Sequence, residues 1–202
     1  MKPNSRGVFW TILASFFVSG LAGLLYQVVW TRYLALFLGS TSYAVVAVLV
    51  AFMGGLAAGN ALLGTRADSL RRPLFFYACL EAGIGFFAVV FPTYFETVRQ
   101  GFLSVVRAVH PEGGARLALQ FGFATLTILL PTVLMGATLP VLTKYVTRSL
   151  SELRGRVAAL YSINSAGAVA GILLADVIPA NWGLGFAGTM ALMTMAASLL
   201  QG

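Results

Sequence analysis

Residues 8–38 read VFWTILASFFVSGLAGLLYQVVWTRYLALFL, a long apolar stretch with a single charge at Arg32. About 20 mostly apolar residues are enough for a helix to cross a bilayer. As one continuous helix this stretch would be roughly 46 Å long, which exceeds a hydrocarbon core of about 30 Å. We therefore expect a membrane-spanning helix that either tilts and projects or bends between Tyr26 and Arg32.

Further apolar stretches follow, separated by short joints that carry charges, glycine or proline. We expect about six spans, at 8–38, 43–64, 74–98, 117–146, 157–178 and 184–201. The polar segment 99–116 should form an outer loop, and Pro131 and Pro140 should kink the fourth span. The sequence thus predicts one all-α transmembrane domain over residues 1–202, a polytopic membrane helix bundle.

The composition argues against a water-soluble fold. Of 202 residues, 59% are hydrophobic and 9% are charged, against roughly 45–50% and 25% in soluble domains. Cys79 and His110 are each the only residue of their type, so we expect neither an intramolecular disulfide nor a structural zinc site. The net charge of +7 lies in the joints between spans, which indicates membrane topology rather than nucleic-acid binding.

The distribution of Lys and Arg predicts the orientation. The inner joints of the expected topology contain nine cations: Lys2, Arg6, Arg66, Arg71, Arg72, Lys144, Arg148, Arg154 and Arg156. The outer joints contain four: Arg32, Arg99, Arg107 and Arg116. Because cytoplasmic joints carry the excess of Lys and Arg, we expect both termini on the cytoplasmic side.

Small residues recur at four-residue spacing in three of the expected spans. The set comprises Ser15, Ser19, Gly23, Gly55, Gly59, Gly167 and Gly171. This spacing places small residues on one helix face, where it allows close backbone approach between helices in lipid. We interpret these faces as helix-packing surfaces, with close approach of a substrate or lipid as the alternative.

Three polar residues inside the expected spans are candidates for lining a site. Tyr161 and Asn164 are three apart and so share a helix face; they could line a polar cavity, or Asn164 could hydrogen-bond a neighbouring helix. Glu81 lies roughly 12 Å into the third span. A carboxylate there must pair with a cation, accept hydrogen bonds or be protonated, which allows a cation or proton site or a partner for an interfacial arginine.

Two further groups of polar residues lie nearer the ends of spans. Gln27 and Arg32 lie in the first span beside Tyr26 and Trp30, a pattern that is also typical of an interfacial aromatic belt. The joint after the second span contains Asp68, Arg71 and Arg72. These three could clamp two helix ends through charge-assisted hydrogen bonds, or they could belong to an ordinary solvated loop.

Four segments in order, 23–32, 51–59, 130–140 and 160–171, read GLLYQVVWTR, AFMGGLAAG, LPTVLMGATLP and LYSINSAGAVAG. Together they resemble the membrane domain of the bacterial membrane-bound spermidine synthase-like family, which implies a bacterial cytoplasmic membrane. The arrangement also resembles one half of a major facilitator fold, whose halves contain three-plus-three repeats.

The resemblance implies a cytoplasmic Rossmann-like aminopropyltransferase domain, but these residues contain no glycine-rich loop after a strand and no acidic catalytic cluster. We therefore expect no enzyme activity and no catalytic residues. Gln27 also stands where the family pattern has Glu. The loss of that carboxylate argues against a site for a cationic polyamine at the first span.

Three functions fit this sequence. The first is a non-catalytic structural or accessory subunit of a larger membrane complex. The second is a transporter half for a small cation such as a polyamine, lined by Glu81, Tyr161 and Asn164. The third is a membrane anchor of a separate aminopropyltransferase. The expected partners are membrane lipids and either other membrane-protein subunits or a second copy. No cofactor is evident, although the 12% aromatic content would suit a bound lipid or pigment.

Overall fold

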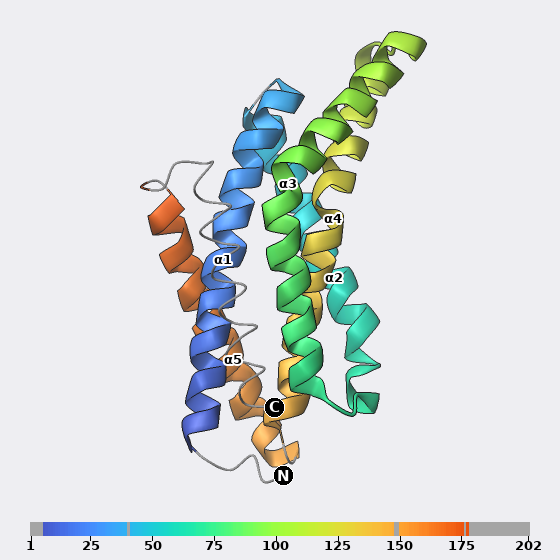
Figure 1. The fold of residues 1–202 in the computed structure, drawn as a ribbon. Helices are drawn as coiled ribbons and strands as arrows, with labels where there is room; N and C mark the ends of the chain where they lie inside the picture. Colours follow the sequence, from blue (N-terminus) through green and yellow to red (C-terminus); the bar gives the residue numbers. More distant parts are fainter. Residues whose placement is uncertain (1–5, 40, 148–149, 176, 178–202) are drawn as a thin grey trace.

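The protein is a bundle of long helices that run along a common direction (Figure 1). The computed structural model describes residues 6–39, 41–147, 150–175 and 177. Its elements are α1 (Arg6–Leu38), α2 (Thr41–Gly64), the short 3-10 helix η1 (Ala67–Ser69), α3 (Pro73–Val109), α4 (Gly113–Val146) and α5 (Leu150–Ala175). The expected sixth span, 184–201, lies outside the described residues.

All five long helices in the described part of the chain are long and apolar enough to cross a membrane. The predicted all-α membrane helix bundle is confirmed, and the chain is a multi-pass membrane protein whose outer surface contacts lipid. The helix α1 continues through Tyr26 and Arg32 without interruption, and α4 continues through Pro131 and Pro140. The first span is therefore one long helix.

The segment 99–116 is not the outer loop that its polar residues predict. Instead α3 extends for 37 residues and α4 for 34, roughly 55 and 51 Å, and their tips project beyond the other helices (Figure 1). Arg99 donates to Glu96 of its own helix at 2.7 Å, and the Phe102 ring lies 5.6 Å from that of Phe123. The helices continue because this charge pair is satisfied locally and the two helices keep packing.

The turn between α3 and α4 is short. His110 ends α3 with a φ of 47° and Gly113 begins α4 with a φ of 52°. Both values lie in the left-handed region, which glycine adopts without steric cost and which commonly ends a helix. The turn therefore reverses the chain within a few residues and holds the two long helices together as a hairpin.

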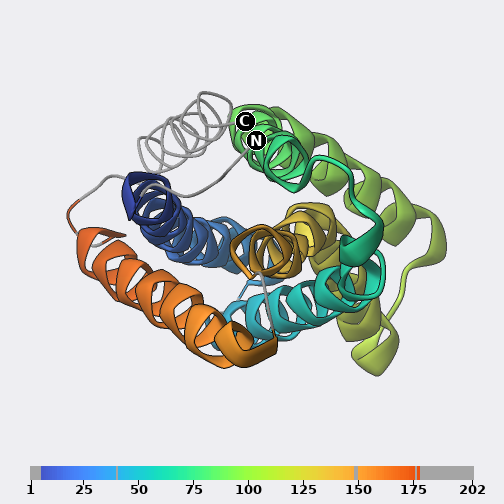
Figure 2. The same ribbon diagram turned by 90° about the horizontal axis from the view of Figure 1, so that it is seen from below.

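The bundle is built around two helix pairs, α1 with α5 and α2 with α4 (Figure 2). In the first pair, a Cβ on Gly167 would collide with the carbonyl oxygen of Phe17, and one on Gly171 would collide with that of Leu21. The contact positions rise together along both helices, so α1 and α5 run parallel. Glycine at these positions allows the backbones to touch, which is how helices associate in lipid.

The second pair uses the same device. A Cβ on Gly55 would collide with Thr132, and one on Gly59 would collide with the carbonyl oxygen of Val133. Each pair also has a glycine on its other helix that lies against the first. In the second pair, Gly136 of α4 lies against Leu56 of α2; in the first pair, Gly20 of α1 lies against Asn164 of α5.

The two pairs correspond at several contact positions, although Gly55 and Gly171 have Ile163 and Leu63 as their counterparts. A constant shift in number carries α1 onto α4 and another carries α2 onto α5. The corresponding positions are Phe17 and Val133, Gly20 and Gly136, Leu21 and Ala137, Leu56 and Asn164, and Gly59 and Gly167. The four helices therefore form a pseudo-symmetric unit.

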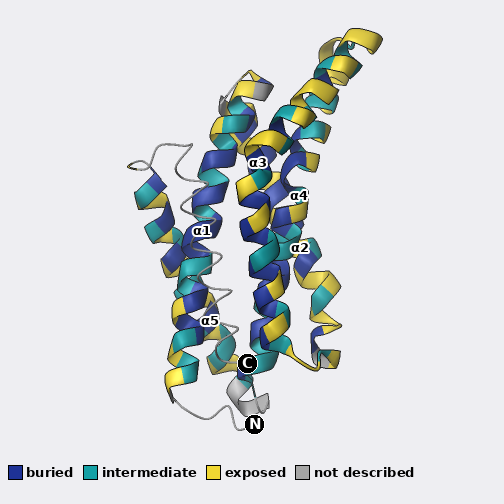
Figure 3. Cartoon of the chain, in the orientation of Figure 1, coloured by how far each residue is buried: buried dark blue, intermediate teal, exposed yellow. Residues whose placement is uncertain are grey.

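The helix α3 packs against α4 and against a group of aromatic residues from α1. Trp30 and Phe91 have ring centroids 5.8 Å apart, and Tyr33 contacts the same phenylalanine edge-on at 5.4 Å. Buried residues gather where the helices face one another, whereas the hairpin tip is largely exposed (Figure 3). These contacts hold the four-helix unit in place around a cavity.

Candidate functional site

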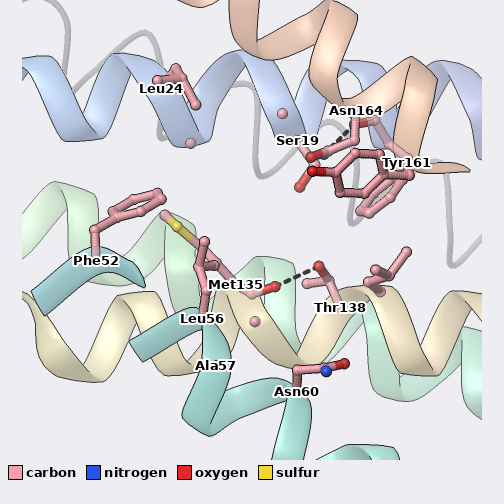
Figure 4. Close-up of a pocket in the computed structure, with 15 residues that line it drawn as sticks. Ser19, Leu24, Phe52, Leu56, Ala57, Asn60, Met135, Thr138, Tyr161 and Asn164 are labelled. Carbon is pink, nitrogen blue, oxygen red and sulfur yellow. Dashed lines mark hydrogen bonds between the residues drawn. The ribbon is translucent and has the colours of Figure 1, made fainter. Parts of the chain in front are cut away.

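A cavity of about 340 Å³ lies between the two helix pairs (Figure 4). All four helices of the pseudo-symmetric unit line it, α1 and α5 on one side and α2 and α4 on the other. Its polar side chains are Ser19, Asn60, Thr138, Tyr161 and Asn164. Most of the remaining wall is apolar. Mostly apolar walls with a few convergent polar groups are typical of small-molecule sites.

The cavity has an exposed side and a buried side. Tyr161 is 67% exposed and Asn60 is also exposed, so these two residues mark its mouth. Gly20 and Gly23 are buried and form part of its inner wall. A Cβ on Gly23 would meet no atom within 4 Å. This glycine therefore makes no packing contact of the kind expected from its four-residue spacing.

Asn164 fits both of its interpretations. Its Nδ2 donates to the carbonyl oxygen of Phe16 at 3.1 Å, which ties α5 to α1. The same side chain lines the cavity next to Tyr161 and Ser19 (Figure 4). The expected neighbours Tyr161 and Asn164 therefore do lie together.

Glu81 is buried, with 1% of its surface exposed. The hydroxyl of Ser19 donates to its Oε1 at 2.7 Å. Because Ser19 also lines the cavity, the carboxyl group lies directly behind one polar residue of the wall. Glu81 itself does not line the cavity, so it can act on a bound molecule only through Ser19 or through its electric field.

Gln27 and Arg32 lie away from the cavity. Gln27 is half-buried, and Arg32 is exposed with its Nη2 donating to the carbonyl oxygen of Ala175 at 3.1 Å. A cation at the last residue of α5 is favourable because carbonyl groups at a helix C-terminus are partly negative. The nearby Tyr26 and Trp30 are each 1% exposed, so they are core residues and form no exposed belt.

The predicted helix-end clamp is described only in part. Arg71 and Arg72 are exposed, and neither forms an ion pair within the described part of the chain. Asp68 lies in η1, and its side chain is outside the description. The clamp stays a prediction.

Three residues of the cavity escape sequence reasoning. Ser19 reads as a small packing residue, yet it is the hydrogen-bond partner of Glu81. Asn60 and Thr138 are polar residues within expected spans. Because polar residues at membrane depth are candidates for function, that rule would have identified both from the sequence. Ser15, in contrast, is simply buried, with 8% of its surface exposed.

No three His, Cys, Asp or Glu side chains gather within the described ranges. The functional argument therefore depends on the cavity and on its surroundings in the bundle. No family model, curated protein or solved structure matches the chain.

Proposed function

We propose that the protein is a non-catalytic subunit of a larger membrane assembly, in which another protein covers the mouth of the cavity. One observation carries this proposal: α5 exposes polar side chains within its membrane-spanning part, one of them at the mouth of the cavity. Tyr161 is 67% exposed, and Ser162 and Ser165 are exposed beside it.

Both arginines at the start of α5, Arg154 and Arg156, belong to the charged joint. Counted from Val157, Tyr161 lies roughly 6 Å and Ser165 roughly 12 Å into the expected span. Lipid tails cannot hydrogen-bond polar groups, which in membrane proteins face protein or a water-filled cavity. A covering protein would satisfy them.

Native mass spectrometry after mild extraction from the source membrane tests this proposal. We expect the chain to be recovered with other subunits in a fixed ratio. The variant Ser165→Leu should weaken that association, whereas Ala14→Leu, at an exposed position of α1, should leave it intact. Recovery of the wild-type chain only as a free monomer would contradict the proposal.

A second candidate is a transporter half for a small cation. It is favoured by Tyr161 and Asn164 lining the same cavity as Ser19, whose hydroxyl donates to the buried Glu81. The pseudo-symmetric helix pairs also fit the three-plus-three repeats of a half major facilitator fold, whose site lies between two such halves. This candidate too requires a covering partner, another subunit or a second copy.

Uptake of a labelled polyamine into proteoliposomes tests the second candidate. The wild-type chain, supplied with its co-purifying partner if there is one, should accumulate the label. Glu81→Gln should reduce uptake at least tenfold, while Cys79→Ser, an exposed position outside the cavity, should not. Equal uptake by Glu81→Gln would exclude Glu81 from the path.

A further inference from the structure

We propose that the cavity binds an uncharged amphiphile with a hydroxylated head and a single apolar chain, of the monoacylglycerol type. The inference goes beyond the proposed accessory role and rests on neither candidate function, because binding is measured on the chain alone. It gives the cavity a different occupant from the polyamine of the second candidate, so one competition experiment separates the two.

The wall of the cavity favours an uncharged ligand. Within the described part of the chain, no charged side chain lines the cavity. A charged group that leaves water for such a site is costly unless it is paired. Glu81 lies behind Ser19, whose hydroxyl donates to it at 2.7 Å, and it has a further interaction within the chain. The carboxyl group therefore requires no cation from the cavity.

Two hydroxyl groups of the wall act as acceptors. Ser19 donates its hydrogen to Glu81, and Thr138 donates its own to the carbonyl oxygen of Met135 at 2.7 Å. A hydroxyl that donates keeps its oxygen lone pairs for accepting. Ser19 and Thr138 therefore suit a ligand that donates hydrogen bonds.

The other three polar side chains bring donors as well as acceptors. Asn164 has one N–H engaged with the carbonyl oxygen of Phe16, which leaves its second N–H and its oxygen. The amide of Asn60 and the hydroxyl of Tyr161 each donate and accept, and both side chains are exposed at the mouth. A head made of hydroxyl groups, which also donate and accept, matches this mixture.

Polar and apolar parts of the wall lie at different depths in the bundle. The first residues of α1 and α5 and the last residues of α2 and α4 lie at one end (Figure 1). From that end, Asn60, Thr138 and Asn164 are roughly 6–11 Å deep, whereas Phe52 and Leu24 are roughly 18 and 24 Å deep. These depths are counted along each helix from Val8, Gly64, Lys144 and Val157. A lipid of the nearer leaflet has the same order, with its head outside and its chain towards the bilayer centre.

The deeper part of the wall has space for an apolar chain. Phe52, Leu56, Met135 and Leu24 supply its surface (Figure 4). A volume of about 340 Å³ lies at the lower end of the range for small-molecule sites, roughly 300–1,000 Å³. The cavity is therefore suited to one short chain rather than to a lipid with two chains.

Gly23 leaves room for this chain. It lines the cavity, and a Cβ on it would meet nothing within 4 Å. Gly20 differs, because a Cβ there would collide with Asn164. A larger side chain at position 23 would therefore extend into the cavity without displacing a neighbouring helix.

Photolabelling of the purified chain in nanodiscs tests the ligand class. The probe is 1-octanoylglycerol with a diazirine in its acyl chain, and peptide mass spectrometry locates the adducts. We expect saturable labelling of the deeper wall, at Leu24, Phe52 or Met135. Labelling that does not saturate, or that spreads over the lipid-facing sides of the helices, would overturn the proposal.

Competition identifies the head group. The competitors are 1-octanoylglycerol, methyl octanoate, octanoate and octylamine, which share one chain length but differ in charge and in O–H donors, together with spermidine. We expect 1-octanoylglycerol to prevent labelling at a concentration at least tenfold lower than any of the others. Prevention by octylamine or spermidine at an equal or lower concentration would overturn the uncharged head, and equal prevention by methyl octanoate would overturn the hydroxylated one.

Variants locate the site. Gly23→Leu should abolish saturable labelling, whereas Gly54→Leu, an exposed glycine of α2 with equally open surroundings, should retain it. Thermal unfolding checks that Gly23→Leu still folds, and unchanged labelling of the folded variant would overturn the proposal. Asn60→Leu, at the exposed mouth, should weaken the effect of 1-octanoylglycerol at least tenfold and leave that of methyl octanoate unchanged.

Glu81→Gln tests whether charge contributes. Because an uncharged ligand does not depend on the carboxylate, we expect labelling by the probe to be unchanged in this variant. A tenfold loss in a folded Glu81→Gln chain would overturn the uncharged ligand.

This inference and the proposed function can fail separately. A chain that is recovered in a fixed-ratio assembly but shows no saturable labelling would contradict this inference alone. A chain that is labelled selectively but is found only as a free monomer would contradict the accessory role and leave the binding site standing.

Discussion

The helix pairs α1–α5 and α2–α4 share their packing but differ in their chemistry. In each pair, glycines of one helix lie against the other helix, and two of these contacts correspond: Gly59 with Gly167 and Gly136 with Gly20. In the first pair the cavity side carries Ser19 and Asn164. In the second, the corresponding positions are Met135 and Leu56, both apolar. The packing is therefore duplicated, whereas these two polar groups occur on one side only.

This difference teaches that glycines and polar residues have separate roles in this bundle. Close backbone contact brings two helices together, and it does so equally well with or without a polar neighbour. The asymmetric residues are consequently the better candidates for function, because helix packing does not require them.

The largest loss of stability should come from disrupting the close glycine contacts that both helix pairs share. Gly167→Leu and Gly59→Leu each place a side chain against backbone that cannot move aside, and we expect each to destabilise the bundle by about 3 kcal/mol. Unfolding in mixed micelles measures both. Gly54→Leu, with no atom within 4 Å of its Cβ, is the matched control, and an equal loss in that variant would show that the collision is not the cause.

A smaller effect should come from the hydroxyl groups on the two sides. Ser19→Ala removes a hydrogen bond to the buried Glu81 and should cost about 1–3 kcal/mol. Thr138→Ala removes a bond to a carbonyl of its own helix and should cost about 0.5 kcal/mol. The same unfolding assay compares them. Equal losses would contradict the expectation that the bond from Ser19 to the buried Glu81 contributes more than a bond within one helix.

The sequence predicts those properties of the structure that depend only on residues near one another in the chain. Apolar length is local, so the spanning helices could be predicted. Helix-face spacing is local too, so Tyr161 and Asn164 could be placed together. The loop prediction for 99–116 is wrong, because Arg99 pairs with Glu96 of its own helix and α3 continues to Val109.

The contacts between helices could not be predicted in the same way. Ser19 and Gly23 belong to the same series of small residues at four-residue spacing. Ser19 nevertheless donates a hydrogen bond to Glu81 of α3, whereas a Cβ on Gly23 would meet no atom within 4 Å. Their roles depend on which helix lies opposite. The depth of Glu81 in its span allows a cation partner, accepted hydrogen bonds or protonation, and nothing local identifies Ser19 as the residue that meets it.

A small effect, comparable to that of Thr138→Ala, should come from making the two pairs alike. Asn164→Leu gives α5 the residue that stands at the corresponding position of α2 and removes the bond to the Phe16 carbonyl oxygen. Interhelical hydrogen bonds in membranes contribute about 0.6 kcal/mol on average, so we expect a loss of that size in the unfolding assay. A loss above about 2 kcal/mol would mean that Asn164 holds the pair together, and its role would then be structural.

The covered mouth of the cavity is the central claim, and photo-crosslinking from Tyr161 tests it most directly. Benzoylphenylalanine at this exposed position would react with whatever lies within reach in the native membrane. We predict one discrete protein adduct, with the same subunit that is recovered in fixed ratio after extraction. Adducts with lipid alone would contradict the claim.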